Sequence, residues 1–172
     1  MSNRWPRSAQ RVSKPVPLWV ALVTAAASGP IMDAGFPDKN LWPLTFVAVG
    51  LVLVTLIGRR AGSSLLVGFV AGATFYFTHI QWASLFLGLL PMSALAVLES
   101  LFFAVGALAI TLAYRWIPAV WPGPFGRLAL LPVAVAGLWT AREAWASVWP
   151  YGGFAWGRVG ISQADGPLAP LF

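Results

Sequence analysis

Apolar residues fill five long stretches of this 172-residue chain, and short polar or glycine-rich segments separate them. The stretches cover residues 16–32, 41–58, 63–83, 92–114 and 128–149. Each is close to the roughly 20 residues that an α-helix needs to cross the hydrocarbon core of a bilayer. The pattern therefore predicts an all-α integral membrane protein with about five transmembrane helices.

The basic residues predict the orientation of these helices, because cytoplasmic loops retain Lys and Arg. Residues 1–15 carry four basic residues, and the gaps after the second and fourth stretches carry two each. The gap after the first stretch carries one, and the gap after the third carries none. We therefore expect a basic cytoplasmic segment (1–15), a transmembrane region (16–149) and an outer-face glycine/aromatic loop (150–172). The basic start is also compatible with a secretory signal peptide, but the later apolar stretches favour a first transmembrane helix.

The composition narrows the possible classes of function. Hydrophobic residues make up 59% of the chain and charged residues 9%, whereas soluble domains average about 25% charged residues. The net charge is +6, but the basic residues flank the apolar stretches instead of forming one patch, which argues against nucleic-acid binding. The chain has no cysteine, so it contains no disulfide, thiolate metal site or cysteine nucleophile. We expect neither a metal nor a cofactor.

Four ionisable side chains lie within the apolar stretches: His79, Glu99, Arg142 and Glu143. Such residues are costly inside a bilayer and usually mark function. The predicted topology places all four in the outer half of the membrane. We expect Arg142 to pair with Glu99 across a helix interface; the alternative is an ion pair that only fixes helix packing. For His79 the alternative is a histidine that serves packing alone.

Two glycines, Gly68 and Gly72, form a G-x-x-x-G pattern in the third stretch. This spacing lets a second helix approach closely in a membrane, although it also arises often by chance.

The loop after the fifth stretch combines glycines with large rings. Gly152 and Gly153 precede Phe154 and Trp156, and aromatic rings of this kind favour the depth of lipid headgroups. The loop is suited to covering an outer-leaflet lipid or forming a lid; the alternative is a plain interfacial anchor.

Three segments together form a pattern that is found in a known family. They are Gly35-Phe36-Pro37 with Leu41-Trp42-Pro43-Leu44, Gly68-Phe69-x-x-Gly72-x-x-Phe75-Tyr76 with Trp82, and Leu138-Trp139-x-x-Arg142-Glu143 with Gly152-Gly153-Phe154-Ala155-Trp156-Gly157-Arg158 and Ser162-Gln163-Ala164-Asp165. The pattern resembles the membrane part of bacterial apolipoprotein N-acyltransferases. The third segment is the most specific, although the family usually has Phe-Pro-Trp where this chain has Phe154-Ala155-Trp156.

The resemblance implies a multi-pass protein of the bacterial cytoplasmic membrane. Members of this family transfer an acyl chain from a phospholipid to the lipid-modified N-terminal cysteine of lipoproteins. They have eight membrane helices and a nitrilase-like domain with a Glu, Lys and Cys catalytic trio. This chain matches the first five helices and the following loop, so we expect no catalytic residue in it and no activity from it alone.

The candidate residues for lining a lipid or substrate site are Trp139, Arg142, Glu143, Phe154 and Trp156, and the further intramembrane polar candidates are His79 and Glu99. A second interpretation is a non-enzymatic membrane scaffold or transporter subunit, in which the charges of the outer half line a permeation path.

Overall fold

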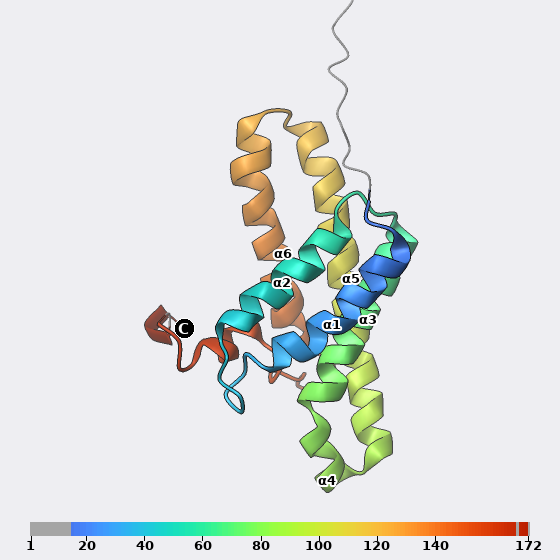
Figure 1. The fold of residues 1–172 in the computed structure, drawn as a ribbon, viewed down its shortest axis with the longest axis vertical. Coiled ribbons are helices and arrows are strands. Elements are labelled where there is room, and N and C mark those ends of the chain that lie inside the picture. The colour runs from blue at the N-terminus through green and yellow to red at the C-terminus, as the bar shows by residue number, and fades with distance from the viewer. Residues whose placement is uncertain (1–14, 168, 172) are drawn as a thin grey trace, which may run out of the picture.

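The computed structural model describes residues 15–167 and 169–171, and all regular structure within them is helical (Figure 1). The long helices are α1 (Leu18–Asp33), α2 (Pro43–Leu56), α3 (Ala61–His79), α5 (Leu89–Val120) and α6 (Leu131–Ala146). Each of them overlaps one of the five predicted apolar stretches. The predicted cytoplasmic segment, residues 1–15, lies outside the described residues except for its last position.

The short elements connect the long helices or follow them. A 3-10 turn (Gln81–Ala83) and α4 (Ser84–Leu87) join α3 to α5, and a wider π-type turn (Gly126–Leu130) leads into α6. Two further 3-10 turns, Val159–Gln163 and Ala169–Leu171, follow α6.

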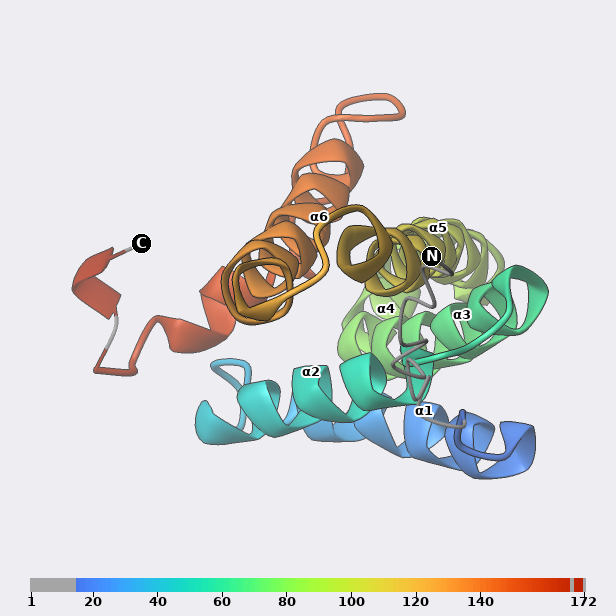
Figure 2. The same ribbon diagram turned by 90° about the horizontal axis from the view of Figure 1, so that it is seen from above.

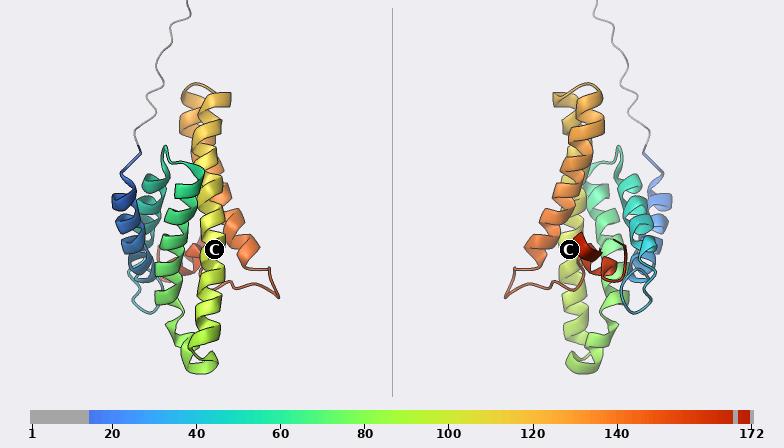
Figure 3. Two further views of the ribbon diagram at one scale, coloured as in Figure 1. Left: turned by 90° about the vertical axis from the view of Figure 1, so that its right-hand side faces the viewer. Right: turned by 90° about the vertical axis from the view of Figure 1, so that its left-hand side faces the viewer.

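The helices form two layers with α6 at one side. Helices α1 and α2 lie next to each other, and α3 and α5 form the layer behind them (Figure 2). The most extensive helix contact is between α3 and α5, followed by α1 with α3, and α6 packs on α5. The segment after α6 turns back past α6 toward the start of α2, and its last turn extends away from the bundle (Figures 2 and 3).

Gly68 and Gly72 lie where α3 meets α5, so the G-x-x-x-G spacing, a weak signal in the sequence, marks a close helix contact here. A Cβ added at Gly68 would lie 2.5 Å from the Cβ of Ala107, and one at Gly72 would lie 2.7 Å from the Cβ of Phe103. Real Cβ atoms do not approach so closely, so glycine is required at both positions. The missing side chains let the two backbones come close enough to pack directly.

The fourth predicted stretch is too short at both ends. Helix α5 begins at Leu89 because Gly88, with φ +83°, reverses the chain after α4. It then continues to Val120, beyond the predicted end at residue 114, and includes Pro118. Proline removes one backbone hydrogen bond, and here the helix ends two residues later, so the loss falls in its final turn.

Arg59 has a structural role beyond its contribution to topology. Its side chain is 4% exposed. Its Nε donates to the Thr55 carbonyl at 2.7 Å, at the end of α2, and its Nη2 donates to the Val16 carbonyl at 2.9 Å. Arg115 of α5 in turn donates to the Arg59 carbonyl at 3.0 Å. The Thr55 carbonyl is in the last turn of α2, where carbonyls lack intrahelical donors, and Arg59 satisfies it. The contacts with Val16, just before α1, and with Arg115 tie the segment after α2 to the start of α1 and to α5.

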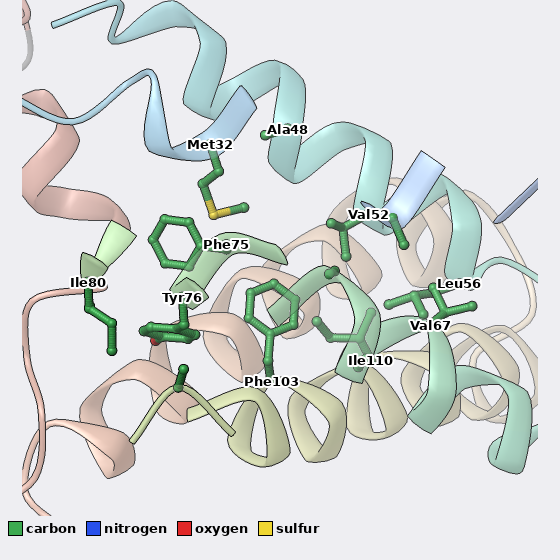
Figure 4. Packing of buried hydrophobic residues seen from close by; sticks show 14 of the residues in the cluster. Met32, Ala48, Val52, Leu56, Val67, Phe75, Tyr76, Ile80, Phe103 and Ile110 are labelled. Atoms are coloured by element: carbon green, nitrogen blue, oxygen red, sulfur yellow. The ribbon is translucent and has the colours of Figure 1, made fainter. Parts of the chain in front are cut away.

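The buried core lies between the two helix layers (Figure 4). It combines large side chains such as Met32, Phe75 and Ile110 with alanines at the closest helix contacts. Many other large apolar side chains face outward, among them Leu85 (84% exposed) and Leu128 (79% exposed). Soluble monomers rarely expose apolar surface on this scale. Helices α3 and α5 are long and apolar enough to cross a membrane, and α1 and α2 are shorter apolar helices.

Candidate functional site

A cluster of polar side chains lies beneath the segment that follows α6. We call residues 147–167 the outer tail, after the outer-face position that the sequence predicts for the loop 150–172. We call Tyr76, Glu99, Trp139, Arg142 and Glu143 the polar cluster. The cluster draws on α3, α5 and α6. It contains three of the five predicted lining residues and one of the two further intramembrane candidates.

Arg142 is 8% exposed and lies between two aromatic rings. Its Cζ is 4.4 Å from the ring centroid of Phe103 and 4.8 Å from that of Trp139. The alkyl part of its side chain fills the space over Gly106, where an added Cβ would lie 2.7 Å from the Arg142 Cδ. A cation over an aromatic face is stabilised most when water is excluded, so this setting supports a buried guanidinium.

Glu143 accepts three hydrogen bonds at a single carboxylate oxygen, Oε1. The donors are Trp139 Nε1 at 2.8 Å, Arg142 Nη2 at 3.1 Å and the backbone N–H of Val159 at 3.2 Å. The third donor belongs to the outer tail. One carboxylate therefore compensates the charge of Arg142 and attaches the outer tail to α6.

The predicted pair between Arg142 and Glu99 is wrong. The ion pair that Arg142 forms in the described structure is with its neighbour Glu143. Adjacent helical positions point about 100° apart, but both side chains are long enough to bend toward each other, and the rings of Phe103 and Trp139 fix the guanidinium where Glu143 reaches it. Glu99 is buried near Tyr76 and Arg142, and its Oε2 has no hydrogen-bond partner.

His79, at the end of α3, joins three separate parts of the chain. Its Nδ1 lies 2.9 Å from Oδ1 of Asp33, in α1, and its Nε2 lies 3.1 Å from the carbonyl oxygen of Trp156, in the outer tail. Asp33 also pairs with Lys39. The histidine therefore belongs to a second polar group at the same end of the bundle, separate from the Arg142–Glu143 pair.

Phe154 and Trp156 have different surroundings in the outer tail. Phe154 is partly buried against the core, and its N–H donates to the Ala146 carbonyl at 2.8 Å. Trp156 is 59% exposed, and its ring centroid lies 5.5 Å from that of Trp82. Between these rings and Val159 lies Gly157, where an added Cβ would be 2.6 Å from the Tyr76 hydroxyl. The outer tail is thus packed onto the bundle.

An apolar groove of about 510 Å³ runs between α2, α5 and α6. Trp139 and Val159 lie at the end where the outer tail crosses, and Tyr114 and Leu131 lie at the other end. The remaining lining residues are Phe46, Val49, Leu53, Pro132, Val135, Ala136 and Thr140. The groove therefore begins next to the Glu143–Val159 contact. Among the described residues, no group of three or more His, Asp or Glu side chains could hold a metal ion.

Sequence reasoning missed the partners that hold these residues. The Val159 N–H is a backbone group, so no side-chain pattern indicates it. Asp33 is 46 positions from His79, so no local pattern links the two. Gly106 and Gly157 give the nearest available signal, because glycine in an ordered region often marks close packing.

The same sequence can be compared with known proteins. Residues 28–172 match the family model for the apolipoprotein N-acyltransferase N-terminal domain. Among curated relatives, the apolipoprotein N-acyltransferase of Azotobacter vinelandii is 29% identical over 165 residues, which cover 90% of this chain and 30% of that protein. The enzyme of Pseudomonas aeruginosa (strain LESB58) is 30% identical over 165 residues, with 90% of this chain and 30% of the relative covered. The enzyme of Vibrio parahaemolyticus is 25% identical over 152 residues, with 86% and 29% covered.

The chain thus spans about 30% of the length of the curated relatives that it matches. The family match includes the polar cluster and the outer tail, and it confirms the resemblance carried by the three sequence segments. This chain belongs to the apolipoprotein N-acyltransferase family, in which it corresponds to the N-terminal domain.

Proposed function

We propose that this chain is the membrane domain of an apolipoprotein N-acyltransferase, which takes an acyl chain from a phospholipid and transfers it to the lipid-modified N-terminal cysteine of a lipoprotein. The observation that carries the proposal is the outer tail folded over the buried Arg142–Glu143 pair, within the region that matches the family. Both partner molecules carry lipid, and this domain would present a lipid-facing surface to them.

The domain crosses the cytoplasmic membrane five times, with residues 1–15 in the cytoplasm and residues 150–172 on the outer face. The outward-facing apolar side chains of α4, α5 and α6 support this arrangement. Helices α1, α2 and α6 have only 14 to 16 residues, fewer than the roughly 20 needed to cross the hydrocarbon core. Apolar residues that flank them, and local thinning of the bilayer, would make up the difference.

The outer tail and the polar cluster contribute the lipid-facing wall of the site. Trp156 offers an exposed ring at headgroup depth, and Phe154 and Trp139 continue the apolar surface inward. Glu143 and Arg142 hold this wall in place from below. The covalent steps need an activated nucleophile; this chain has no cysteine, so a nitrilase-like domain supplies it and this chain alone is inactive.

A chimeric enzyme tests the proposal. The matched region of the Azotobacter vinelandii enzyme is replaced by this chain, and the chimera is expressed in bacterial cells depleted of their own N-acyltransferase. The mass of the N-terminal peptide of a lipoprotein is then measured. We expect the chimera to add one acyl chain to that peptide and this chain alone to add none.

Two outcomes would contradict the proposal. If the chimera accumulates in the membrane as well as its parent but leaves the lipoprotein amine free, this chain does not replace the family's membrane domain, and a scaffold or transporter role becomes the better interpretation. If the chain alone adds the acyl group, its expected inactivity is wrong.

A further inference from the structure

We propose that His79 is a positioning residue, held as an imidazolium between Asp33 and the Trp156 carbonyl, and that it fixes the outer tail to α1 and α3. The two contacts are 2.9 Å from Nδ1 to Asp33 Oδ1 and 3.1 Å from Nε2 to the Trp156 oxygen. The inference goes beyond the proposed function and does not depend on it.

The protonation state follows from the partners of the ring. A neutral imidazole has one N–H donor and one acceptor nitrogen. The carbonyl of Trp156 can only accept, so Nε2 must carry a proton. The partner of Nδ1 is a carboxyl group that also pairs with the ammonium of Lys39, which favours the ionised carboxylate. Both nitrogens therefore face acceptors, and both must donate.

The surroundings hold the ring in this position. It stacks on Phe75, with centroids 5.0 Å apart and planes at 15°, and it contacts Phe36 at 4.3 Å. The charged group facing the ring from α1 is Asp33, and Lys39 of the following loop acts on the ring through Asp33. The outer tail contributes an uncharged carbonyl. Only 12% of the His79 side chain is exposed; its contact with Asp33 is partly buried, and its contact with the Trp156 carbonyl is open to solvent.

The contact fixes the middle of the outer tail. Upstream, the Phe154 N–H donates to Ala146, and downstream the Val159 N–H donates to Glu143. Between them the Trp156 carbonyl is bound by His79. His79 therefore holds the stretch of the outer tail that lies between its two attachments to α6.

A spectroscopic experiment reads the proton directly, because His79 is the sole histidine of the chain. The whole chain is labelled with ¹⁵N-histidine and studied in nanodiscs. At about pH 7.5, where a free imidazole is mostly neutral, we expect both ring nitrogens at imidazolium chemical shifts, and Asp33→Asn should move them toward those of a neutral ring. Shifts of a neutral tautomer in the parent at this pH, or no change in Asp33→Asn, would overturn the proposal.

Hydrogen exchange tests the positioning role. His79→Phe keeps a ring between Phe36 and Phe75 but removes both polar contacts. We expect the amides of Arg158 and Val159 to exchange about tenfold faster in this variant, since a hydrogen bond to a charged group is lost. The matched control is Thr78→Ala, which removes only a bond within α3, to the Thr74 carbonyl.

Equal protection of these two amides in His79→Phe and in the parent refutes the positioning role. If His79→Phe does not fold, the exchange of the same two amides in Asp33→Asn decides the question, because this variant removes the carboxylate that holds the ring.

Discussion

At the scale of single residues, Glu143 combines an electrostatic role with a structural one. Its Oε1 accepts hydrogen bonds from Trp139, Arg142 and the backbone of Val159. Its side chain is 11% exposed and that of Arg142 is 7% exposed. A buried ion pair contributes little when intact, but removing one partner leaves the other charge uncompensated. The two residues are therefore expected to depend strongly on each other.

Replacing Glu143 should destabilise the domain. Glu143→Ala leaves the Arg142 guanidinium and the Val159 N–H without their acceptor, and the loss of one partner of a buried pair costs about 3–5 kcal/mol. Glu143→Gln keeps an acceptor oxygen and should cost less. The measurement is the free energy of unfolding in detergent.

The control for this experiment is Asp165→Ala, which removes an exposed carboxylate from the same tail. An unfolding free energy of Glu143→Ala that equals that of Asp165→Ala would mean that the three hydrogen bonds do not stabilise the fold.

At the scale of helices, close packing depends on glycine and alanine positions. The backbones of α3 and α5 meet at Gly68 and Gly72, and an added Cβ at Gly72 would also lie 2.9 Å from the Cα of Ser100. Because that neighbour is backbone, it cannot move aside as a flexible side chain would. The G-x-x-x-G pattern was a weak signal in the sequence, and the structure shows which helix it faces.

Gly72→Ala should force α3 and α5 apart. Overpacking in a well-packed interior typically costs about 1–3 kcal/mol, and the cost here should lie at the upper end because backbone atoms must move. Thermal unfolding of the purified domain measures it. Gly50→Ala in α2 is the control, since an added Cβ there meets nothing within 4 Å. The control should be neutral or slightly stabilising, because alanine favours helix more than glycine does; equal midpoints for the two variants would contradict this account.

The outer tail is an element without a hydrophobic period, and its position comes from contacts with other elements. Phe154 and Val159 are fixed by α6, and Trp156 is fixed by α3. The glycine/aromatic composition correctly indicated a segment different in kind from the helices. It did not indicate that this segment folds back over buried charges.

At the scale of the whole molecule, the distribution of apolar surface agrees with a membrane domain. Large apolar side chains face outward from the turn around α4 and from the far end of the α5–α6 hairpin. These regions lie at opposite ends of the long axis (Figure 1). The proposed topology assigns the first to the outer side and the second to the cytoplasmic side.

Single cysteines test this topology cleanly, because the chain has none of its own. Tyr151→Cys lies in the outer tail at a fully exposed position that already carries a side chain. Pro124→Cys lies at an exposed position where the chain between α5 and α6 becomes helical again. In intact cells a membrane-impermeant thiol reagent should label Tyr151→Cys, and it should label Pro124→Cys only after the membrane is permeabilised. The reverse pattern would invert the proposed orientation.

The sequence by itself determined the helical class, the approximate bounds of the long helices and the family. These depend on local properties: apolar runs are continuous in the chain, and the motifs around Trp139 and Gly152 are contiguous. It also singled out His79, Glu99, Arg142 and Glu143, because charge within an apolar run is visible without a structure.

Only the tertiary structure decided how those charges are paired. The partner of Arg142 is its neighbour Glu143 and not Glu99, because the rings of Phe103 and Trp139 fix the guanidinium. The partners of His79 come from residues 46 and 77 positions away. Hydrogen bonds and ion pairs form only between atoms that lie a few ångströms apart in space. Which residues are paired therefore depends on how the helices and backbone groups are placed, and the sequence pattern does not specify that placement.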